Sequence, residues 1–376
     1  MMLTSTQQAI ADTVREFAQE RIRPHANAFE AARAYPPQLF EELAGLGLMG
    51  MTAPEEFGGA GADTVSYALA LMEIAAADGA LSTILSIQNS LIVSALLKDG
   101  SDAQRERFLP ALLAGRMIGA FALTEADAGS DASALRTRAT KADDGTYVLN
   151  GSKQFISSGR IAGLAIAFAV TDPSADKKGI SAFLVPTDRP GYVVDKVEHK
   201  LGQLASDTCS LRFENLRIEP ALRLGAEGQG YRIALSNLEA GRIGIAAQSI
   251  GMARAALEVA AGYAKERRSM GKAIIQHQAV GFRFADLAAR LEAARQLVLH
   301  AASVKDAGLP CLKEASMAKL VASETAEAVV SGAIQTLGGY GYLEDFALAK
   351  IYRDVRVCQI YEGTSDIQRM VIARSL

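Results

Sequence analysis

The chain has few of the residues from which disulfide frameworks, metal centres and nucleophile triads are built. Its 376 residues include three cysteines, an odd number, placed far apart at Cys209, Cys311 and Cys358. Such cysteines fit a reducing compartment and show no metal-ligand spacing. The histidines form no metal-ligand or nucleophile pattern either; they are His25, His199, His277 and His300. We therefore expect no metal site.

An excess of charge of one sign and a long apolar run are also missing. The chain has 39 Lys and Arg against 42 Asp and Glu, a formal net charge of -3. No basic block predicts nucleic-acid binding. The N-terminus has no apolar signal core, and no uninterrupted apolar run is long enough to span a bilayer. We expect a soluble cytoplasmic protein without a nucleic-acid or membrane partner.

No dinucleotide fingerprint is present, because no Gly-x-Gly-x-x-Gly motif lies between a strand and a helix. This speaks against a Rossmann domain. The glycine-rich segment 55–61 lacks the P-loop lysine, so a plain loop is the better interpretation. At 49% hydrophobic residues, the chain can bury more than one core, which predicts two or three compact units.

Residues 1–117 read as an all-helical domain. Ile10, Val14, Phe17 and Ile22 form one apolar stripe of a helix that Pro24 is expected to end. Two more apolar helices are predicted over 65–76 and 81–97. Within the second, the polar side chains either face solvent or line a pocket; they are Gln88, Asn89 and Ser90.

The period changes from about residue 118, and residues 118–229 read as a β domain. Asn150-Gly151 separates two strand patterns and predicts a hairpin with a type I′ turn. No long helical pattern separates the strands, which favours an antiparallel barrel or sandwich. The further strand candidates cover 164–170, 180–185, 192–197 and 210–213.

Residues 230–376 return to long helices. They are rich in Ala, Leu, Glu and Arg, which favour helix, and their small faces let helices approach closely. We predict a four-helix bundle that packs against copies of itself. The fold class is therefore α+β. The helix candidates cover 231–268, 280–305, 312–337 and 343–361.

Glu362 is the candidate catalytic residue. It emerges from an apolar, helix-like run into the break Gly363-Thr364-Ser365. Partial desolvation there would raise its pKa toward the range of a general base. Gly363 would let a ligand approach the backbone closely. The alternative is that Gly363 ends a helix, Thr364 or Ser365 caps the next, and Glu362 is a solvated charge.

Several spaced motifs, taken together, resemble the acyl-CoA dehydrogenase family, in its order and over essentially the whole chain. Phe121–Asp131 is similar to the family's first signature, and two later segments are similar to its C-terminal signatures: Gln335–Tyr342 and Tyr361–Arg369. Two others look most like the short/branched-chain members: Glu239–Gln248 and Lys313–Lys319. Such a combination is far more specific than one glycine-rich loop.

The resemblance implies removal of the α proton and the β hydride of an acyl-CoA, which requires a redox cofactor. In the family this is FAD, bound without a Rossmann domain, and the electrons pass to an electron-transfer flavoprotein. Phe155 stands where the family often has tryptophan, so the ring is kept and the indole N–H is lost. The implied cofactor contacts are Phe121, Leu123, Thr124, Gly129, Ser130, Phe155, Ile156, Ser157, Arg267, Gln278, Gln335, Gly338, Gly339, Thr364 and Asp366.

Other roles follow from the same resemblance. Arg267 matches an arginine on the FAD pyrophosphate of a neighbouring subunit, which implies a shared flavin site and a tetramer; a solvated helix end remains its alternative. Some members carry the base immediately before the residue matching Arg242. Here that position is Gly241, which cannot act as a base and so favours Glu362. The implied substrate contacts are Ser130, Glu239, Arg242 and Gly363.

The substrate expectation is a short straight or methyl-branched acyl-CoA of about four to six acyl carbons, with segment 87–91 closing the tail pocket. Two other functions stay open. One is a flavin oxidase or nitroalkane-oxidising relative on the same scaffold. The other is a non-catalytic helical scaffold, against which the acidic pI and Glu362 both argue.

Overall fold

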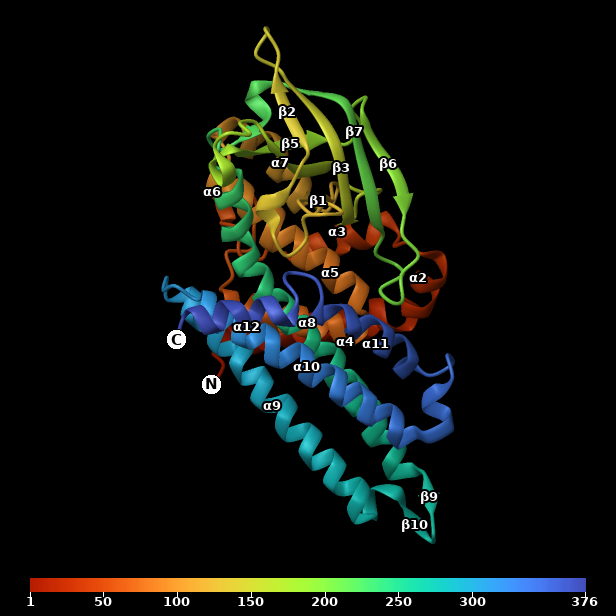
Figure 1. The fold of residues 1–376 in the computed structure, drawn as a ribbon. Coiled ribbons are helices and arrows are strands. Elements are labelled where there is room, and N and C mark those ends of the chain that lie inside the picture. Colours follow the sequence, from red (N-terminus) through yellow and green to blue (C-terminus); the bar gives the residue numbers. More distant parts are fainter.

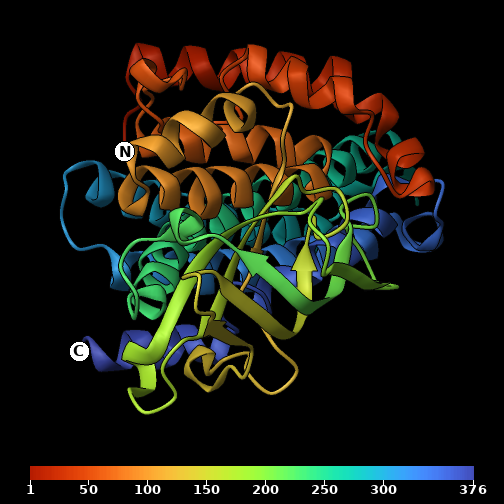
Figure 2. The same ribbon diagram turned by 90° about the horizontal axis from the view of Figure 1, so that it is seen from above.

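The computed structural model describes residues 1–376, which form a helical N-terminal part, a central β-sheet and a C-terminal set of long helices (Figure 1). The predicted helical, β and helical order is confirmed. In Figure 2 the red and orange N-terminal helices lie along one side of the molecule. Their bounds are α1 Ser5–Phe17, α2 Ala26–Ala32, α3 Pro37–Gly45, α4 Thr64–Ala77, α5 Gly79–Ile87, α6 Ser94–Asp99 and α7 Asp102–Leu113.

The first helix begins at Ser5. Thr4 is the N-cap, and it forms a capping box with Gln7. Pro24 does not end the helical path, contrary to the prediction. A π-helical turn over Ala18–Ile22 and a 3-10 turn over Arg23–His25 lead into α2. Proline is tolerated there because the first turn of a helical segment needs no donor from it.

One continuous helical run, Gly79–Asp99, is long and apolar enough to cross a membrane by length and composition, with a mean hydropathy of 1.6. The sequence-based expectation that no such run exists is therefore corrected. Within the protein, 83% of this window is buried, as in a core helix. The three polar residues that the sequence left open, Gln88, Asn89 and Ser90, are buried rather than solvent-facing. The Gln88 side chain accepts from Gly119 N, at the start of the first strand, at 2.9 Å, and that of Asn89 accepts from Met51 N at 2.7 Å.

The central sheet is mixed rather than wholly antiparallel. Its strand order is β6-β7-β3-β2-β4-β5-β8, with β1 beside β4. The pairs β1–β4 and β2–β4 are parallel, because the chain crosses between them instead of turning back. The bounds are β1 Gly119–Ala122, β2 Arg138–Lys141, β3 Tyr147–Ser157, β4 Leu164–Val170, β5 Ile180–Pro186, β6 Tyr192–Val197, β7 Thr208–Ile218 and β8 Arg223–Leu224.

Asn150-Gly151 is not a hairpin turn, so that prediction is wrong. Both residues lie within β3, at a register shift against β7. The Asn150 side chain accepts a hydrogen bond from the backbone N of Asn215 on β7 at 2.8 Å. Gly151 has a φ of 149°, and an added Cβ would lie 2.6 Å from Thr137 Oγ1. The two residues that signal a turn here form a bulge that lets β3 pair on both sides.

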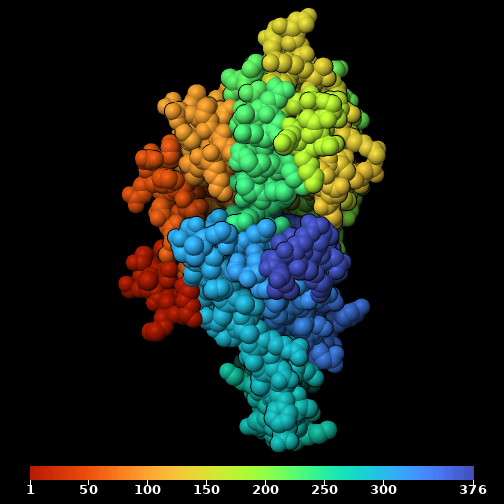
Figure 3. All heavy atoms as spheres, turned by 60° about the vertical axis from the view of Figure 1, so that its left-hand side comes forward, coloured from red at the N-terminus to blue at the C-terminus, as the bar shows by residue number.

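The C-terminal part is built on α8 Gly230–Glu266, α9 Gln278–Asp306 and α10 Leu312–Leu337, followed by the shorter α11 Ala347–Val355 and α12 Ser365–Arg374. A two-stranded hairpin, β9 Arg268–Ser269 and β10 Lys272–Ala273, joins α8 to α9. Figure 3 shows this tip (teal) projecting beyond the rest of the molecule. The main core joins α1, α4 and α5 to α8–α10, and a second joins the sheet to α6, α7 and the start of α8.

A buried ion pair fastens the segment after β1 to β3. Lys153 on β3 is 1% exposed, and its Nζ lies 2.7 Å from Glu125 Oε1. The Glu125 carboxylate also accepts the backbone N–H of Thr137 at 3.1 Å. Burial lowers the pKa of Lys153 to about 8, which the charge of Glu125 opposes. This pair holds residues 123–125 in place.

We expect Lys153→Met to lower the free energy of unfolding by about 3–5 kcal/mol, because it leaves the buried Glu125 carboxylate without its cation. Urea denaturation of the variant and the parent protein measures the change. Lys196→Met is the matched control, since the Lys196 side chain is 60% exposed and its pair with Glu198 should contribute less than about 1 kcal/mol. Equal effects of the two substitutions would contradict the prediction.

Candidate functional site

The Glu362 site begins at a sharp backbone turn between α11 and α12. Glu362 and Gly363 both have left-handed backbones, with φ values of 55° and 88°. Such a conformation costs a residue with a Cβ about 1–2 kcal/mol. The Thr364 hydroxyl accepts the backbone N–H of Ile367 at 3.3 Å and so caps α12. The helix cap of the alternative interpretation is thus present, but Glu362 itself is not a solvated end charge.

The Glu362 carboxylate lies against α8. A Cβ added at Gly241 would come within 2.6 Å of Glu362 Oε2. The glycine is therefore needed for this approach. Although Glu362 as a residue is partly exposed, Oε2 is buried and has no hydrogen-bond partner. Burial raises the pKa of Glu362 to about 7, and the charges of Arg242 and Lys319 oppose that rise. Such a carboxylate is suited to accept a proton near neutral pH.

Arg242 follows Gly241 on α8 and is 7% exposed. Burial lowers the pKa of its guanidinium, while Glu362 and Glu239 act in the opposite direction. No carboxylate oxygen lies within 4.0 Å of it, and its Nε has no partner. The structure thus brings Arg242 and Gly363 to Glu362, while Glu239 acts on Arg242 and accepts from the Cys311 thiol at 3.2 Å. Arg242 is left as a buried cation with donors for an incoming acceptor.

The two segments predicted to bind the flavin ring lie side by side. Gln154 N donates to Thr124 O at 2.9 Å, and Lys153 Nζ donates to Leu123 O at 3.1 Å. Leu123 and Ile156 are buried and belong to the sheet core. The remaining members reach the surface to differing degrees; they are Phe121, Thr124, Gly129, Ser130, Phe155 and Ser157.

Phe155 is exposed over 64% of its surface and has a φ of 58°. An exposed aromatic ring suits a flat ring system, and the hydroxyl groups and open glycine of the same two segments suit its polar edge. A Cβ added at Gly129 would meet nothing within 4 Å, so a ligand has room to approach the backbone there. These residues therefore fit the isoalloxazine ring of FAD.

A second group of predicted cofactor residues lies elsewhere, at the tip of the C-terminal helices. Arg267 follows α8 directly, 25 residues after Arg242. At about 1.5 Å per residue this is roughly 37 Å away. Arg283 Nη1 donates to Thr336 Oγ1 at 3.2 Å and so ties α9 to the end of α10. All of this group are exposed; they are Arg267, Gln278, Gln335, Gly338 and Gly339.

One chain therefore does not bring the tip residues to the Glu362 site. The Arg267 side chain makes no hydrogen bond or ion pair within its own chain, whereas its backbone N donates to Tyr263 O at 2.8 Å. Both interpretations of the side chain therefore stay open. Near Glu362, Thr364 is engaged as the cap of α12. The Asp366 side chain is 92% exposed and pairs with Arg369 at 3.3 Å.

Sequence reasoning missed the polar side chains that support the turn. Lys319 Nζ and Gln368 Nε2 bond its carbonyl oxygens. On the other side, the Tyr361 hydroxyl meets Gln248 and lies 3.3 Å from Thr83 Oγ1. The only available signal was a lysine in an alanine-rich helix.

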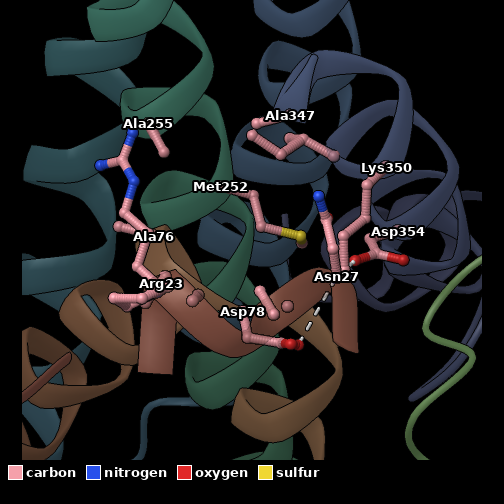
Figure 4. A pocket seen from close by; sticks show the side chains of 15 residues that line it. Arg23, Asn27, Ala76, Asp78, Met252, Ala255, Ala347, Lys350 and Asp354 are labelled. Carbon is pink, nitrogen blue, oxygen red and sulfur yellow. Dashed lines mark hydrogen bonds and ion pairs between the residues drawn. The ribbon is translucent and has the colours of Figure 1, made fainter. Parts of the chain in front are cut away.

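The polar network continues away from Glu362. Gln203 lies 3.4 Å from the Tyr361 hydroxyl, and its backbone N donates to Asp354. Asp354 Oδ2 accepts from Lys350 Nζ at 2.6 Å, and Asp78 lies 3.6 Å from the same ammonium. Asp78, Lys350 and Asp354 line a cavity of about 150 Å³ (Figure 4). The cavity thus lies behind the network and apart from the Glu362 carboxylate.

Comparison with known proteins covers the whole chain. Three family models match: the acyl-CoA dehydrogenase N-terminal domain at residues 4–116, the middle domain at 120–216 and the C-terminal domain at 228–376. The chain is 47% identical to an acyl-CoA dehydrogenase of Bacillus subtilis, covering 100% of this chain and 99% of the relative. It is 44% identical to the human mitochondrial short-chain specific acyl-CoA dehydrogenase, covering 100% and 90%.

Among solved structures, a chain from a study of the electron transferring flavoprotein of Acidaminococcus fermentans and flavin-based electron bifurcation superposes with a TM-score of 0.97. That chain is 40% identical, and the match covers 100% of this chain and 98% of the other. Similarity of sequence and fold thus extends from end to end.

The raised pKa of Glu362 predicts how its replacement affects stability. Below pH 4.5, the ordinary value, the carboxyl is protonated in both folded and unfolded chains. Between pH 4.5 and about 7 only the unfolded chain has lost the proton, so folding becomes less favourable as pH rises. The free energy of unfolding of Glu362→Gln should therefore rise relative to that of the parent between pH 4.5 and about 7. Above pH 7 the difference between the two proteins should stay constant.

Melting temperatures from pH 4 to 8.5 measure the difference. Glu106→Gln, at an exposed position on α7, controls for the substitution itself. A difference that shrinks as pH rises would mean that the folded chain favours the charged form.

Proposed function

Because the chain belongs to the acyl-CoA dehydrogenase family, we propose that it oxidises a short-chain acyl-CoA to its trans-2-enoyl-CoA with bound FAD and passes the electrons to an electron-transferring flavoprotein. The observation that carries the proposal is the Glu362 carboxylate, buried over Gly241 with an unpartnered Oε2 and a pKa raised to about 7 by burial. An unpartnered buried oxygen lowers stability, and a role in the reaction explains why this one is retained.

In the proposed reaction the Glu362 carboxylate takes the proton from the α carbon of the acyl group. FAD, when bound, supplies the acceptor for the hydride that leaves the β carbon, and the C–H bond electrons at the α carbon become the new double bond. The backbone N–H of Glu362 donates to no acceptor within the chain. It is free to bond the thioester oxygen, where negative charge develops. Buried Arg242 adds positive charge on the same side.

A short acyl chain is supported by the packing next to Glu362. One turn after Gly241, a Cβ added at Gly244 would lie 2.3 Å from Ser86 Oγ and 2.8 Å from Tyr67 OH. The helices are so close there that no room remains for a tail between them. Ser86 directly precedes Ile87, so the wall lies at the start of the segment predicted to close the tail pocket. The human relative is named short-chain specific, which agrees with this proposal.

A cofactor site shared between two chains is supported by the separation of the two predicted groups. Residues 121–130 and 155–157 suit the flavin ring, while Arg267 and its neighbours lie at the far tip. A second copy of this chain, by presenting its tip, could complete the site with a guanidinium for the pyrophosphate. The exposed Met270 and Phe282 at the tip, 91% and 65% exposed, are apolar surface that a partner would cover. We propose a tetramer assembled from such pairs.

We expect kcat/KM to be highest for acyl-CoA substrates of about four to six acyl carbons. Each methylene that no longer fits costs about 1–3 kcal/mol, so activity should fall on longer chains. Reduction of an electron-transferring flavoprotein across a panel of straight and methyl-branched acyl-CoAs measures this. A maximum on a long-chain substrate would contradict it, and rapid peroxide release without such an acceptor would favour an oxidase.

Glu362→Gln should slow anaerobic flavin reduction by at least about 10²-fold, because a general base commonly contributes 10²–10⁴-fold. The amide keeps the size of the side chain, so FAD content and acyl-CoA binding should remain near the parent values. In the parent, kcat/KM should rise with pH through about 7 as the carboxylate forms, and the variant should lack this limb. Near-parent bleaching by the variant would show that another group is the base.

A further inference from the structure

Lys319 is a fully buried ammonium close to the Glu362 turn. It lies on α10 at 0% exposure, and its Nζ donates to the carbonyl oxygen of Gly363 at 2.6 Å. No carboxylate oxygen lies within 4.0 Å of it. An unpaired buried charge costs several kcal/mol. A methionine would fill the same space without that cost, so packing alone does not explain a lysine.

The bond from Lys319 acts on the strained part of the turn. Gly363 O accepts a second bond from Gln368 Nε2 at 2.9 Å, and the same amide lies 3.1 Å from Glu362 O. Gln368 is 0% exposed and lies on α12. A Cβ at Gly363 would stand 2.8 Å from its Nε2. Two buried donors from two helices thus fix both carbonyls of the left-handed pair, and with them the direction in which the Glu362 side chain leaves the backbone.

The surroundings of the Glu362 carboxylate contain few charges. Arg242 faces it from α8 and Lys319 from α10, and both favour its charged form. The neutral Tyr67 hydroxyl faces it from α4. The Cys358 thiol stands beside Lys319 on the 3-10 turn Arg356–Gln359. Lys319 therefore supplies one of only two positive charges that offset the burial of the carboxylate.

We infer that Lys319 is a positioning residue for the proton transfer: its ammonium fixes the Gly363 carbonyl, which aims the Glu362 carboxylate, and its charge favours the ionised form of that base. Gln368 shares the first task and has no part in the second. The inference rests on the proposed function, in which Glu362 takes the α proton.

The test compares four variants of the FAD-loaded protein. Lys319→Met removes a hydrogen bond and a charge, and Lys319→Arg keeps the charge. Gln368→Leu removes the two hydrogen bonds of the amide without changing any charge. Lys313→Met is the control on the same helix, where an exposed lysine pairs only with Glu314 at 3.6 Å. The first readout is the rate of anaerobic flavin reduction by butyryl-CoA from pH 6 to 9.

Lys319→Met should reduce this rate about 10- to 100-fold at pH 6.5, as a misdirected base does. The loss should be smaller at pH 9, because the Glu362 carboxylate is then ionised in both proteins and Lys319, whose pKa burial lowers to about 8, has lost most of its charge in the parent. In Lys319→Arg the rate should rise with pH around the same midpoint as in the parent, even if the rate itself is lower. Gln368→Leu should lower the rate with the limb unmoved. The KM for butyryl-CoA should stay within about twofold throughout, and Lys313→Met should follow the parent.

The second readout needs no turnover. The infrared carbonyl band of a protonated carboxyl, assigned to Glu362 by its loss in Glu362→Gln, should titrate at higher pH in Lys319→Met than in the parent. A parent-like rate and band in Lys319→Met, or a lower rate with an unmoved limb and a raised KM, would overturn the inference. If Lys319→Met yields no FAD-bound protein, the other two variants decide. The inference is then overturned if the pH midpoint of the rising rate moves in Gln368→Leu, or moves to higher pH in Lys319→Arg.

Failure of the proposed function has a different signature. In that case Glu362→Gln itself would reduce the flavin at the parent rate. If Glu362→Gln reduces the flavin slowly while Lys319→Met reduces it at the parent rate, only the role of Lys319 is rejected.

Discussion

The structure depends on the close passage of α8 between its neighbours. This single helix reaches from the sheet core to the far tip and packs on α4, α5, α9 and α10. At Gly251 a Cβ would stand 2.1 Å from the Met72 carbonyl oxygen of α4, and at Gly244 it would meet Ser86 of α5. At Gly241 it would meet the Glu362 carboxylate. Three missing side chains along one helix thus set helix spacing and leave space for a buried acid.

That spacing determines the electrostatics of the site. A carboxylate pressed against a helix backbone loses its water, which by itself favours the neutral acid. Two buried cations from two different helices offset the loss without forming an ion pair with it. A direct pair would hold the carboxylate in its charged form and compete with a substrate for its oxygens. Cations acting at a distance leave the oxygens free while the pKa stays near neutrality.

The order of helical and β parts could be predicted from the sequence, and Glu362 could be singled out as the candidate base, because apolar periodicity and contiguous motifs are local. The predictions that were wrong also came from local sequence signals. Asn150-Gly151 has the chemistry of a turn, yet pairing on both sides kept it within β3. Pro24 was tolerated at the start of a 3-10 turn. The supports of Glu362 could not be predicted, because Lys319 and Gln368 are 43 and 6 residues from it along the chain. Only the folded arrangement of α10 and α12 makes them neighbours.

The contact between Gly241 and Glu362 limits how this scaffold can evolve. The two positions compete for one volume, so a chain with full-length acids at both would be overcrowded. A chain with an acid at neither has no base at this place. In the proposed mechanism, moving the base from the loop to the helix by successive single substitutions therefore passes through a chain that is poorly active or poorly packed. Lineages with the base on the helix and lineages with it on the loop should thus remain distinct once separated, even where their folds stay superposable.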